Sequence, residues 1–300
     1  MTKNLIVIVG PTAIGKTSIS IKIAKALGCE IVSADSRQFY KEMNIGTAVP
    51  TNQELSEAKH HFIQHISILD NYSVGDFEKE AIALIEELFQ NNEYVILVGG
   101  SGLYVDAVTK GLDEFPDIPP HVRTQLQEIL NNEGIEALQD RLKVLDPQHY
   151  QNVDINNPHR IMRALEVCIG TGHTYSSFLS KPKKQRPFSV IKIGLLADRE
   201  VIYDRIDQRV NMMVQEGLIE EVKTLKAYES LNALNTVGYK EIFKSLNGEW
   251  TLDFAISEIK KNTRRFAKRQ LTWFRKDKEI KWFDYTTNSE MVIDHIKKNS

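Results

Sequence analysis

Cysteine is scarce in this chain of 300 residues, and long apolar runs are missing. The two cysteines, Cys29 and Cys168, allow at most one disulfide, which excludes a disulfide-stapled secreted domain and a cysteine-only metal site. The aliphatic run 5–9 is far shorter than the roughly 18 apolar residues of a membrane span. We therefore expect a cytoplasmic protein without a membrane partner.

Proline and glycine are also few, with 9 and 16 residues, whereas 42% of the residues are hydrophobic and 26% are charged. This balance excludes a disordered or collagen-like chain and is typical of a globular protein with one large or two modest domains. Neither sign of charge is in excess, because 38 Lys and Arg stand against 40 Asp and Glu and the net charge is -2. A polyanionic partner would therefore have to be held by local basic patches.

Strand and helix patterns alternate along the first hundred residues, which indicates βαβ units on a parallel sheet. Buried strands are predicted over 5–9, 30–33, 94–98, 190–196 and 280–285, and helices over 16–27, 76–91 and 199–275. Proline-containing segments at 115–120 and 181–187 bracket a charged helical stretch. We predict an α/β core formed by residues 1–112 and 188–300, with a helical insertion domain over residues 113–187.

A phosphate-binding loop is predicted directly after the first strand. The pattern G-x-x-x-x-G-K-[ST] is matched by Gly10, Pro11, Thr12, Ala13, Ile14, Gly15, Lys16 and Thr17. The glycines let the backbone wrap a phosphate, Lys16 adds a positive charge, and the Thr17 hydroxyl can bind a Mg²⁺ that also bridges phosphate oxygens. The loop predicts a P-loop NTPase-like parallel sheet and a diphosphate or triphosphate ligand. It does not imply hydrolysis, because the strand 94–98 ends in glycines rather than an acidic metal partner; Asp70 is a weak candidate for that partner.

Two further segments should meet this loop at the carboxyl edge of the sheet, where ligands of open parallel sheets bind. They are residues 33–40, after the second strand, and residues 99–104, after the third. Asp35 in the first segment can act as a general base, a metal ligand or a helix N-cap. Ser101 in the second can act as a catalytic hydroxyl or as an ordinary turn residue.

Basic residues gather in three further places. Arg205 and Arg209 share one helix face by their i, i+4 spacing, where they clamp a phosphate or pair with aspartates of the same helix. Residues 260–281 contain ten Lys or Arg and two acids, a local charge of +8, interleaved with aromatic residues. This segment is either the footprint of an RNA backbone or a solvated helix face. Residues 181–192 add five cations and no acid.

Six motifs in order, over nearly the whole chain, resemble the tRNA dimethylallyltransferase family. They are GPTAIGKT (10–17), DSRQFY with NIGTAVP (35–50), GGSGLY (99–104), DP with NPHRIMRALE (146–166), VGYKE (237–241) and KRQLTWFR (268–275). The resemblance implies transfer of a dimethylallyl group from dimethylallyl diphosphate to N6 of adenosine 37, beside the anticodon of tRNAs that read codons beginning with U. It also implies Asp35 as general base on a flipped-out adenine. We expect Mg²⁺ as cofactor and a monomeric protein.

The resemblance also implies which residues do the work. The loop 10–17 would bind the diphosphate and hold Mg²⁺ through Thr17, and Ser101, where the family usually has Thr, would reach the bridging oxygen. The insertion would grip the anticodon stem. Residues implied to contact tRNA are Asp35, Ser36, Arg37, Gln38, Ser101, Arg123, His159, Arg160, Arg163, Gly238, Tyr239, Lys240, Lys268, Arg269, Gln270, Trp273 and Arg275. His159 is equally an ordinary histidine between domains.

Three other interpretations stay open. An adenylate isopentenyltransferase shares the loop and the base but prenylates free AMP or ATP, and it has little need of the insertion or the basic segment. A P-loop small-molecule kinase would use Asp35 to activate a substrate hydroxyl, with ATP as donor. A non-catalytic RNA-binding module has no use for Lys16 and Thr17. The insertion and the basic segment favour tRNA as the acceptor.

Overall fold

Six parallel strands form one sheet within the residues that the computed structural model describes, 2–179 and 185–300. They are β1 (Asn4–Val9), β2 (Ile31–Ser33), β3 (His60–His61), β4 (Tyr94–Gly99), β5 (Ser189–Leu196) and β6 (Lys281–Asp284). The strand order is β3-β2-β4-β1-β5-β6, and every neighbouring pair is parallel. The predicted α/β class with a parallel sheet is confirmed.

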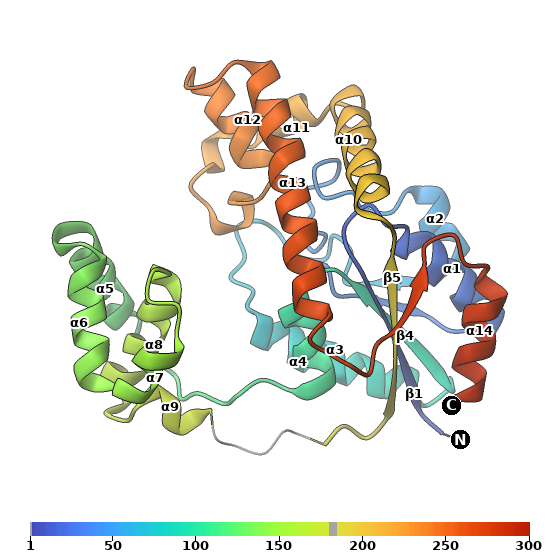
Figure 1. Cartoon of the computed structure of the whole chain (residues 1–300), viewed down its shortest axis with the longest axis horizontal. Coiled ribbons are helices and arrows are strands. Elements are labelled where there is room, and N and C mark those ends of the chain that lie inside the picture. Colours follow the sequence, from blue (N-terminus) through green and yellow to red (C-terminus); the bar gives the residue numbers. More distant parts are fainter. Residues whose placement is uncertain (1, 180–184) are drawn as a thin grey trace. The chain divides into compact units, whose positions relative to one another are not determined.

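The chain divides into two compact units, Met1–Lys110 with Gln185–Ser300, and Gly111–Lys184. In the first unit, helices cover both faces of the sheet (Figure 1). The helices of this unit are α1 (Lys16–Leu27), α2 (Asn52–Glu57), α3 (Val74–Leu88), α4 (Gly102–Lys110), α10 (Arg199–Gln215), α11 (Leu218–Thr224), α12 (Tyr239–Leu246), α13 (Leu252–Phe274) and α14 (Ser289–Lys298). Two short 3-10 turns, η1 (Lys226–Tyr228) and η2 (Asn232–Leu234), precede α12.

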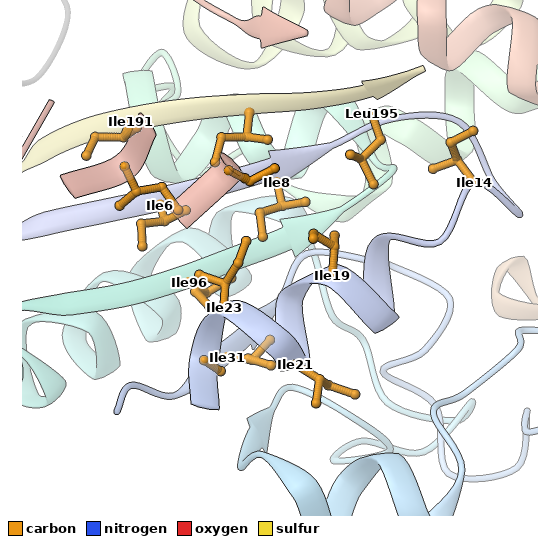
Figure 2. Close-up of a cluster of buried hydrophobic side chains, with 14 of the residues drawn as sticks. Ile6, Ile8, Ile14, Ile19, Ile21, Ile23, Ile31, Ile96, Ile191 and Leu195 are labelled. Carbon is orange, nitrogen blue, oxygen red and sulfur yellow. The ribbon is translucent and has the colours of Figure 1, made fainter. Parts of the chain in front are cut away.

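The central strand β1 explains the layered architecture, because all six of its residues are buried. Side chains alternate between the two faces of a strand. Ile6 and Ile8 pack with Ile23 of α1 in one cluster (Figure 2), whereas Val7 packs with Phe77 of α3 in another. A continuous β-branched run is what a parallel strand needs when helices cover both of its faces.

The helical pattern predicted over residues 199–275 is interrupted in the structure. The helix α10 ends at Gln215, and Gly217, the N-cap residue of α11, has a φ of 104°, in the left-handed region that favours glycine. The chain then passes through α11, the two 3-10 turns and α12 before Thr251 caps α13 with its side chain. Helices α2, α4 and α14 and strand β3 were not predicted from the sequence; β3 consists of two histidines, too short to show a strand pattern.

The second unit is helical and has a core of its own. Its helices are α5 (Pro120–Glu133), α6 (Ile135–Leu145), α7 (Pro147–Asn152), α8 (Pro158–Thr171) and α9 (Tyr175–Phe178). Leu126, Leu138 and Leu165 are fully or almost fully buried within it. Proline stands at the first position of α5, α7 and α8, where its missing N–H costs no intrahelical bond. Among the described helices, none has the length and apolarity that crossing a bilayer demands.

Candidate active site at the carboxyl edge of the sheet

The phosphate loop between β1 and α1 has a positive φ at three positions. Gly10 has a φ of 150°, Ala13 of 65° and Gly15 of 107°. Alternation of right-handed and left-handed residues turns consecutive N–H groups to one side, as in anion-binding nests. Pro11, Ala13 and Ile14 are buried, so of these three only Ala13 and Ile14 can serve a diphosphate, through their backbone N–H groups. Pro11 has no N–H and can offer only its carbonyl oxygen.

Lys16 folds back onto the loop that precedes it. Its Nζ donates to the carbonyl oxygens of Gly10 at 3.1 Å and Pro11 at 2.9 Å. Burial lowers the pKa of Lys16 to about 8, an effect that the nearby Asp35 opposes and Arg209 reinforces. Lys16 therefore loses its charge at a pH much closer to neutrality than an exposed lysine does.

A cavity of about 370 Å³ opens beside the loop. Its lining includes Thr12, Gly15, Lys16, Thr17, Ser33, Asp35, Gln38, Ile45, Val49, Glu54, His60, Arg205, Arg209, Met212 and Glu216. The structure thus brings together the phosphate loop, the segment after β2 and the two arginines predicted to clamp a phosphate. Ser36, Arg37 and Ser101 are not part of this lining.

Asp35 follows β2 and faces this cavity. Its Oδ1 accepts a hydrogen bond from the backbone N–H of Arg37 at 3.2 Å, within a series of turns. In the described chain the next α-helix is α2, so the helix-cap interpretation of Asp35 is wrong. Burial raises the pKa of Asp35, and the Arg37 N–H, Lys16 and Arg209 partly oppose that rise. A carboxylate of raised pKa in a cavity is suited to proton transfer.

Ser101 contacts Ser36, the residue after Asp35, and is not among the residues that line the cavity. Its Oγ lies 3.3 Å from the Ser36 hydroxyl and accepts from the Ser36 N–H at 3.3 Å. The loops after β2 and β4 can approach each other this closely because residue 99 is glycine: a Cβ there would lie 2.6 Å from the Ala34 carbonyl oxygen. The loops after β2 and β4 are therefore in contact at the expected catalytic edge.

Arg205 and Arg209 project from α10 into the cavity lining. The Arg205 Nε donates to the Ala13 carbonyl at 2.8 Å, which ties α10 to the phosphate loop. The alternative in which both arginines pair with aspartates of their own helix is wrong. Asp207 instead accepts both its hydrogen bonds from Arg264, at 2.8 Å, and the side-chain amide of Gln208 donates to Asp204 at 2.7 Å.

The segment 44–50 lines one side of the cavity, and Glu221 fixes its backbone by hydrogen bonds. The Glu221 carboxylate accepts from the N–H groups of Asn44, Ile45 and Gly46 at 3.0, 2.7 and 3.0 Å. It also accepts from the Tyr239 hydroxyl at 2.6 Å. Glu221 was not predicted from the sequence, because an acid inside a charged helix gives no signal of such a role.

Tyr239 corrects an expectation. It is fully buried, and a Cβ at Gly46 would lie 2.5 Å from its ring, so its side chain supports the cavity wall rather than facing RNA. Gly238 is buried as well, with its N–H donated to Glu241 at 2.8 Å. Lys240, the third residue of this motif, is exposed and remains available to a nucleic acid.

The helix α13, which lies beside α10 (Figure 1), carries much of the predicted basic surface. Lys268, Arg269 and Arg275 are exposed. Trp273 is 39% exposed, and its Nε1 donates to Asp106 of α4 at 2.9 Å. Other cations of the segment 260–281 are engaged within the protein, among them Arg264 with Asp207 and Lys261 with Glu258.

Gln270 differs from its neighbours on α13 because it is only 6% exposed. Its Oε1 accepts from the Thr12 N–H at 2.8 Å, and its Nε2 donates to the Gly100 carbonyl at 3.0 Å. Both ends of the side-chain amide are thus occupied by backbone groups of the protein. The expectation that Gln270 contacts tRNA is therefore wrong, since a buried and satisfied amide offers RNA nothing.

The second basic stretch, residues 181–192, is not an open cationic surface where the structure describes it. Arg186 donates to Glu78 at 2.6 Å and Lys192 to Asp277 at 2.8 Å, and both side chains are 10% exposed. Residues 181–184 lie outside the described part of the chain.

In the second unit, four residues expected to contact tRNA lie on α5 and α8. Arg123 of α5 donates to Glu166 at 2.7 Å, and Arg163 donates to the other oxygen of the same carboxylate at 3.4 Å. The Glu166 side chain is 5% exposed, whereas those of the arginines are 62% and 45% exposed. One buried acid thus presents two cations to solvent. His159 and Arg160 are exposed in the first turn of α8.

Oxygen donors suited to Mg²⁺ are present at the start of α1. Thr17 lines the cavity beside Lys16, and Asp35 faces the same space. Within residues 2–179 and 185–300, no three His, Cys, Asp or Glu side chains gather as a metal cluster. Mg²⁺ suits such a site, because it retains waters and is commonly held by one or two protein oxygens plus phosphate. Asp70 is excluded as a partner: it is exposed in a turn and outside the lining.

The fold defines a parallel α/β protein, and comparisons with known proteins specify the family. The family model described as IPP transferase matches residues 38–277. The tRNA dimethylallyltransferases of Christiangramia forsetii and Flavobacterium johnsoniae are 60% and 58% identical over 297 and 303 aligned residues, covering 99% of this chain and 98% of each relative. The chain belongs to the IPP transferase family.

Solved structures agree with this assignment. The tRNA isopentenylpyrophosphate transferase of Bacillus halodurans is 38% identical with a TM-score of 0.73, over 99% of this chain and 95% of that one. A eukaryotic dimethylallyltransferase acting on tRNA is 26% identical with a TM-score of 0.82, over 99% of this chain and 80% of that one. The resemblance seen in the six sequence motifs is confirmed.

Proposed function

We propose that this protein transfers the dimethylallyl group of dimethylallyl diphosphate to N6 of adenosine 37 in tRNA. The family and the names of its relatives support the reaction class. The observation that carries the proposal is that Lys16 and Asp35 line one cavity, so that a diphosphate cradle and a candidate base share the same space.

The diphosphate would be bound by the loop 10–17. Its N–H groups, the Lys16 ammonium and the Arg209 guanidinium would stabilise the negative charge that grows on the leaving group. Mg²⁺, held through the Thr17 hydroxyl, would supply additional neutralisation of that charge. This explains why a nucleotide-type loop serves here without a hydrolytic partner acid.

Asp35 would act as the general base. The exocyclic amine of adenine is a weak nucleophile, because its lone pair is delocalised into the ring. N6 forms a bond to C1 of the donor while the C1–O bond breaks and diphosphate leaves with the electron pair. The N6 proton passes to the Asp35 carboxylate, whose pKa burial has raised. Ser101 would donate its hydroxyl hydrogen to the bridging oxygen of the diphosphate.

The acceptor base must leave its stack to reach a cavity of this kind. Exposed cations of α13, among them Lys268 and Arg269, would hold the RNA backbone. In the second unit, Arg123, Arg160 and Arg163 would hold the anticodon stem. We further propose a monomer that acts in the cytoplasm.

The deciding experiment incubates the protein with dimethylallyl diphosphate labelled in the prenyl carbons and with tRNA, AMP or a mixture of both. The proposal expects label on tRNA, at adenosine 37 after nuclease digestion and mass spectrometry. Label on AMP alone would establish an adenylate isopentenyltransferase. Phosphoryl transfer from labelled ATP, with no prenyl transfer, would establish a kinase.

A further inference from the structure

Gln270 stands at a junction between two loops that the proposed reaction uses. It lies on α13 between the exposed residues Arg269 and Trp273, yet it is 6% exposed. Its amide joins Thr12 of the phosphate loop to Gly100, the residue before Ser101. These contacts link positions 258 and 170 residues away along the chain.

The chemistry of the partners fixes how the amide is oriented. The Thr12 N–H can only donate, so Oε1 must face it; the Gly100 carbonyl can only accept, so Nε2 must face that. Of the natural side chains of this length, only glutamine carries both an acceptor and a donor at its tip. Glutamate offers two acceptors, and methionine offers neither strong group.

The fit at Gly100 is close. A Cβ at Gly100 would lie 2.2 Å from Gln270 Nε2 and 3.7 Å from Lys16 Nζ. The glycine therefore leaves the space that the amide fills, next to the lysine of the phosphate loop. A change of the amide would act on both loops at once.

We infer that Gln270 is a positioning residue that holds the phosphate loop and the Ser101 loop at the spacing required for prenyl transfer. This inference rests on the proposed function. One N–H of the phosphate loop, that of Thr12, is committed to Gln270 rather than to the diphosphate. Because Gln270 belongs to the helix that carries Lys268 and Arg269, the same element that would bind RNA also sets the geometry of the two loops.

The test compares Gln270→Met and Gln270→Glu with the wild-type protein. Met keeps the length without either hydrogen bond, and Glu keeps the acceptor for Thr12 while turning a carboxylate toward the Gly100 carbonyl. Ser257→Ala, at an exposed position of the same helix, is the control. We expect kcat to fall roughly 10- to 100-fold in both Gln270 variants, because small misplacements of reacting groups have effects of that order. The Kd for tRNA and the values for Ser257→Ala should stay at the wild-type level.

A second measurement, binding of inorganic pyrophosphate by calorimetry, separates this inference from the proposed function. Weaker pyrophosphate binding in the Gln270 variants supports the positioning role even if wild-type protein transfers no prenyl group. Folded variants with wild-type kcat and pyrophosphate affinity overturn it. A loss of tRNA affinity equal to the loss of kcat also overturns it, since α13 itself would then be displaced.

Discussion

The hydroxyl groups of Ser36 and Ser101 lie 3.3 Å apart, at the contact between the loops that follow β2 and β4. The Ser36 N–H also donates to Ser101 Oγ. Because Ser36 follows Asp35 directly, this contact fixes the position of Asp35, the proposed base, relative to Ser101, the proposed hydroxyl donor. The loop after β4 is thus joined to the loop after β2 at Ser36, and to the phosphate loop through Gln270.

Replacing Ser101 tests the hydroxyl donor. Ser101→Ala should lower kcat by about 10²-fold, the effect of losing one donor to a developing negative charge. Ser101→Thr keeps the hydroxyl and restricts its rotamers, so it should retain wild-type kcat or exceed it. Single-turnover rates with tRNA measure both. A normal rate for Ser101→Ala would remove Ser101 from the reaction.

Titration of Asp35 should set the acid side of the pH profile of kcat/KM. Only its carboxylate form can accept the N6 proton, so kcat/KM should fall as the pH drops through the pKa of Asp35. Burial raises that pKa, and the fall should therefore begin at a higher pH than for an exposed aspartate. Asp35→Asn should lower turnover by about 10²-fold or more and remove this dependence, with tRNA affinity unchanged. A variant as active as the wild type would exclude Asp35 as the base.

Titration of Lys16 should set the alkaline side of the pH profile of kcat/KM. In the proposed reaction its ammonium would bind the diphosphate, and its pKa is lowered to about 8, so kcat/KM for dimethylallyl diphosphate should decline as the pH rises above about 8. In Lys16→Arg the guanidinium stays charged. Whatever activity that variant keeps should show no decline in this range, and a decline at the same pH would assign the titration to another group.

Lys268 and Arg269 test the RNA surface. The double variant Lys268→Ala/Arg269→Ala should weaken tRNA binding and reduce the slope of log Kd against log salt by about 2, one for each lost phosphate contact. Lys297→Ala/Lys298→Ala removes the same charge from exposed positions of α14 and is the matched control. Filter binding between 50 and 200 mM salt, a range in which such contacts change affinity strongly, measures both. An unaltered slope for the α13 variant would place the RNA elsewhere.

Glu166 tests the presentation of Arg123 and Arg163. Glu166→Gln should lower the free energy of unfolding by about 1–3 kcal/mol, because a buried amide replaces the acceptor of two arginines. It should also weaken tRNA binding, since the freed arginines lose their fixed position. Glu133→Gln is the control, because Glu133 pairs with Arg141 at 3.8 Å between exposed side chains. Equal behaviour of the two variants in denaturant titrations and tRNA binding would contradict this role.

Periodicity and motifs predicted the elements that bury apolar residues locally. The run 5–9 predicted β1, and the pattern G-x-x-x-x-G-K-[ST] predicted the phosphate loop, because both signals lie in consecutive residues. The two-residue strand β3 was not predicted, since two residues show no periodicity. The breaks between α10 and α13, where the short elements α11, η1, η2 and α12 follow one another, were not predicted either.

The predicted site residues show a similar division. Lys16, Thr17, Asp35 and both arginines of α10 do meet at one cavity. Motif membership alone could not separate exposed Lys268 from buried Gln270, two residues along the same helix, because burial depends on distant partners. Glu221 was missed for the same reason: the backbone groups it holds are some 175 residues away in the chain.

The most direct test of the account is a crystal structure of the protein with an anticodon stem-loop and an unreactive thiolate analogue of dimethylallyl diphosphate. We predict pyrophosphate oxygens against the N–H groups of the loop 10–17, and the extruded adenine with N6 at hydrogen-bonding distance from the Asp35 carboxylate. An adenine that remains stacked in the RNA, or an Asp35 side chain turned away from N6, would contradict the account.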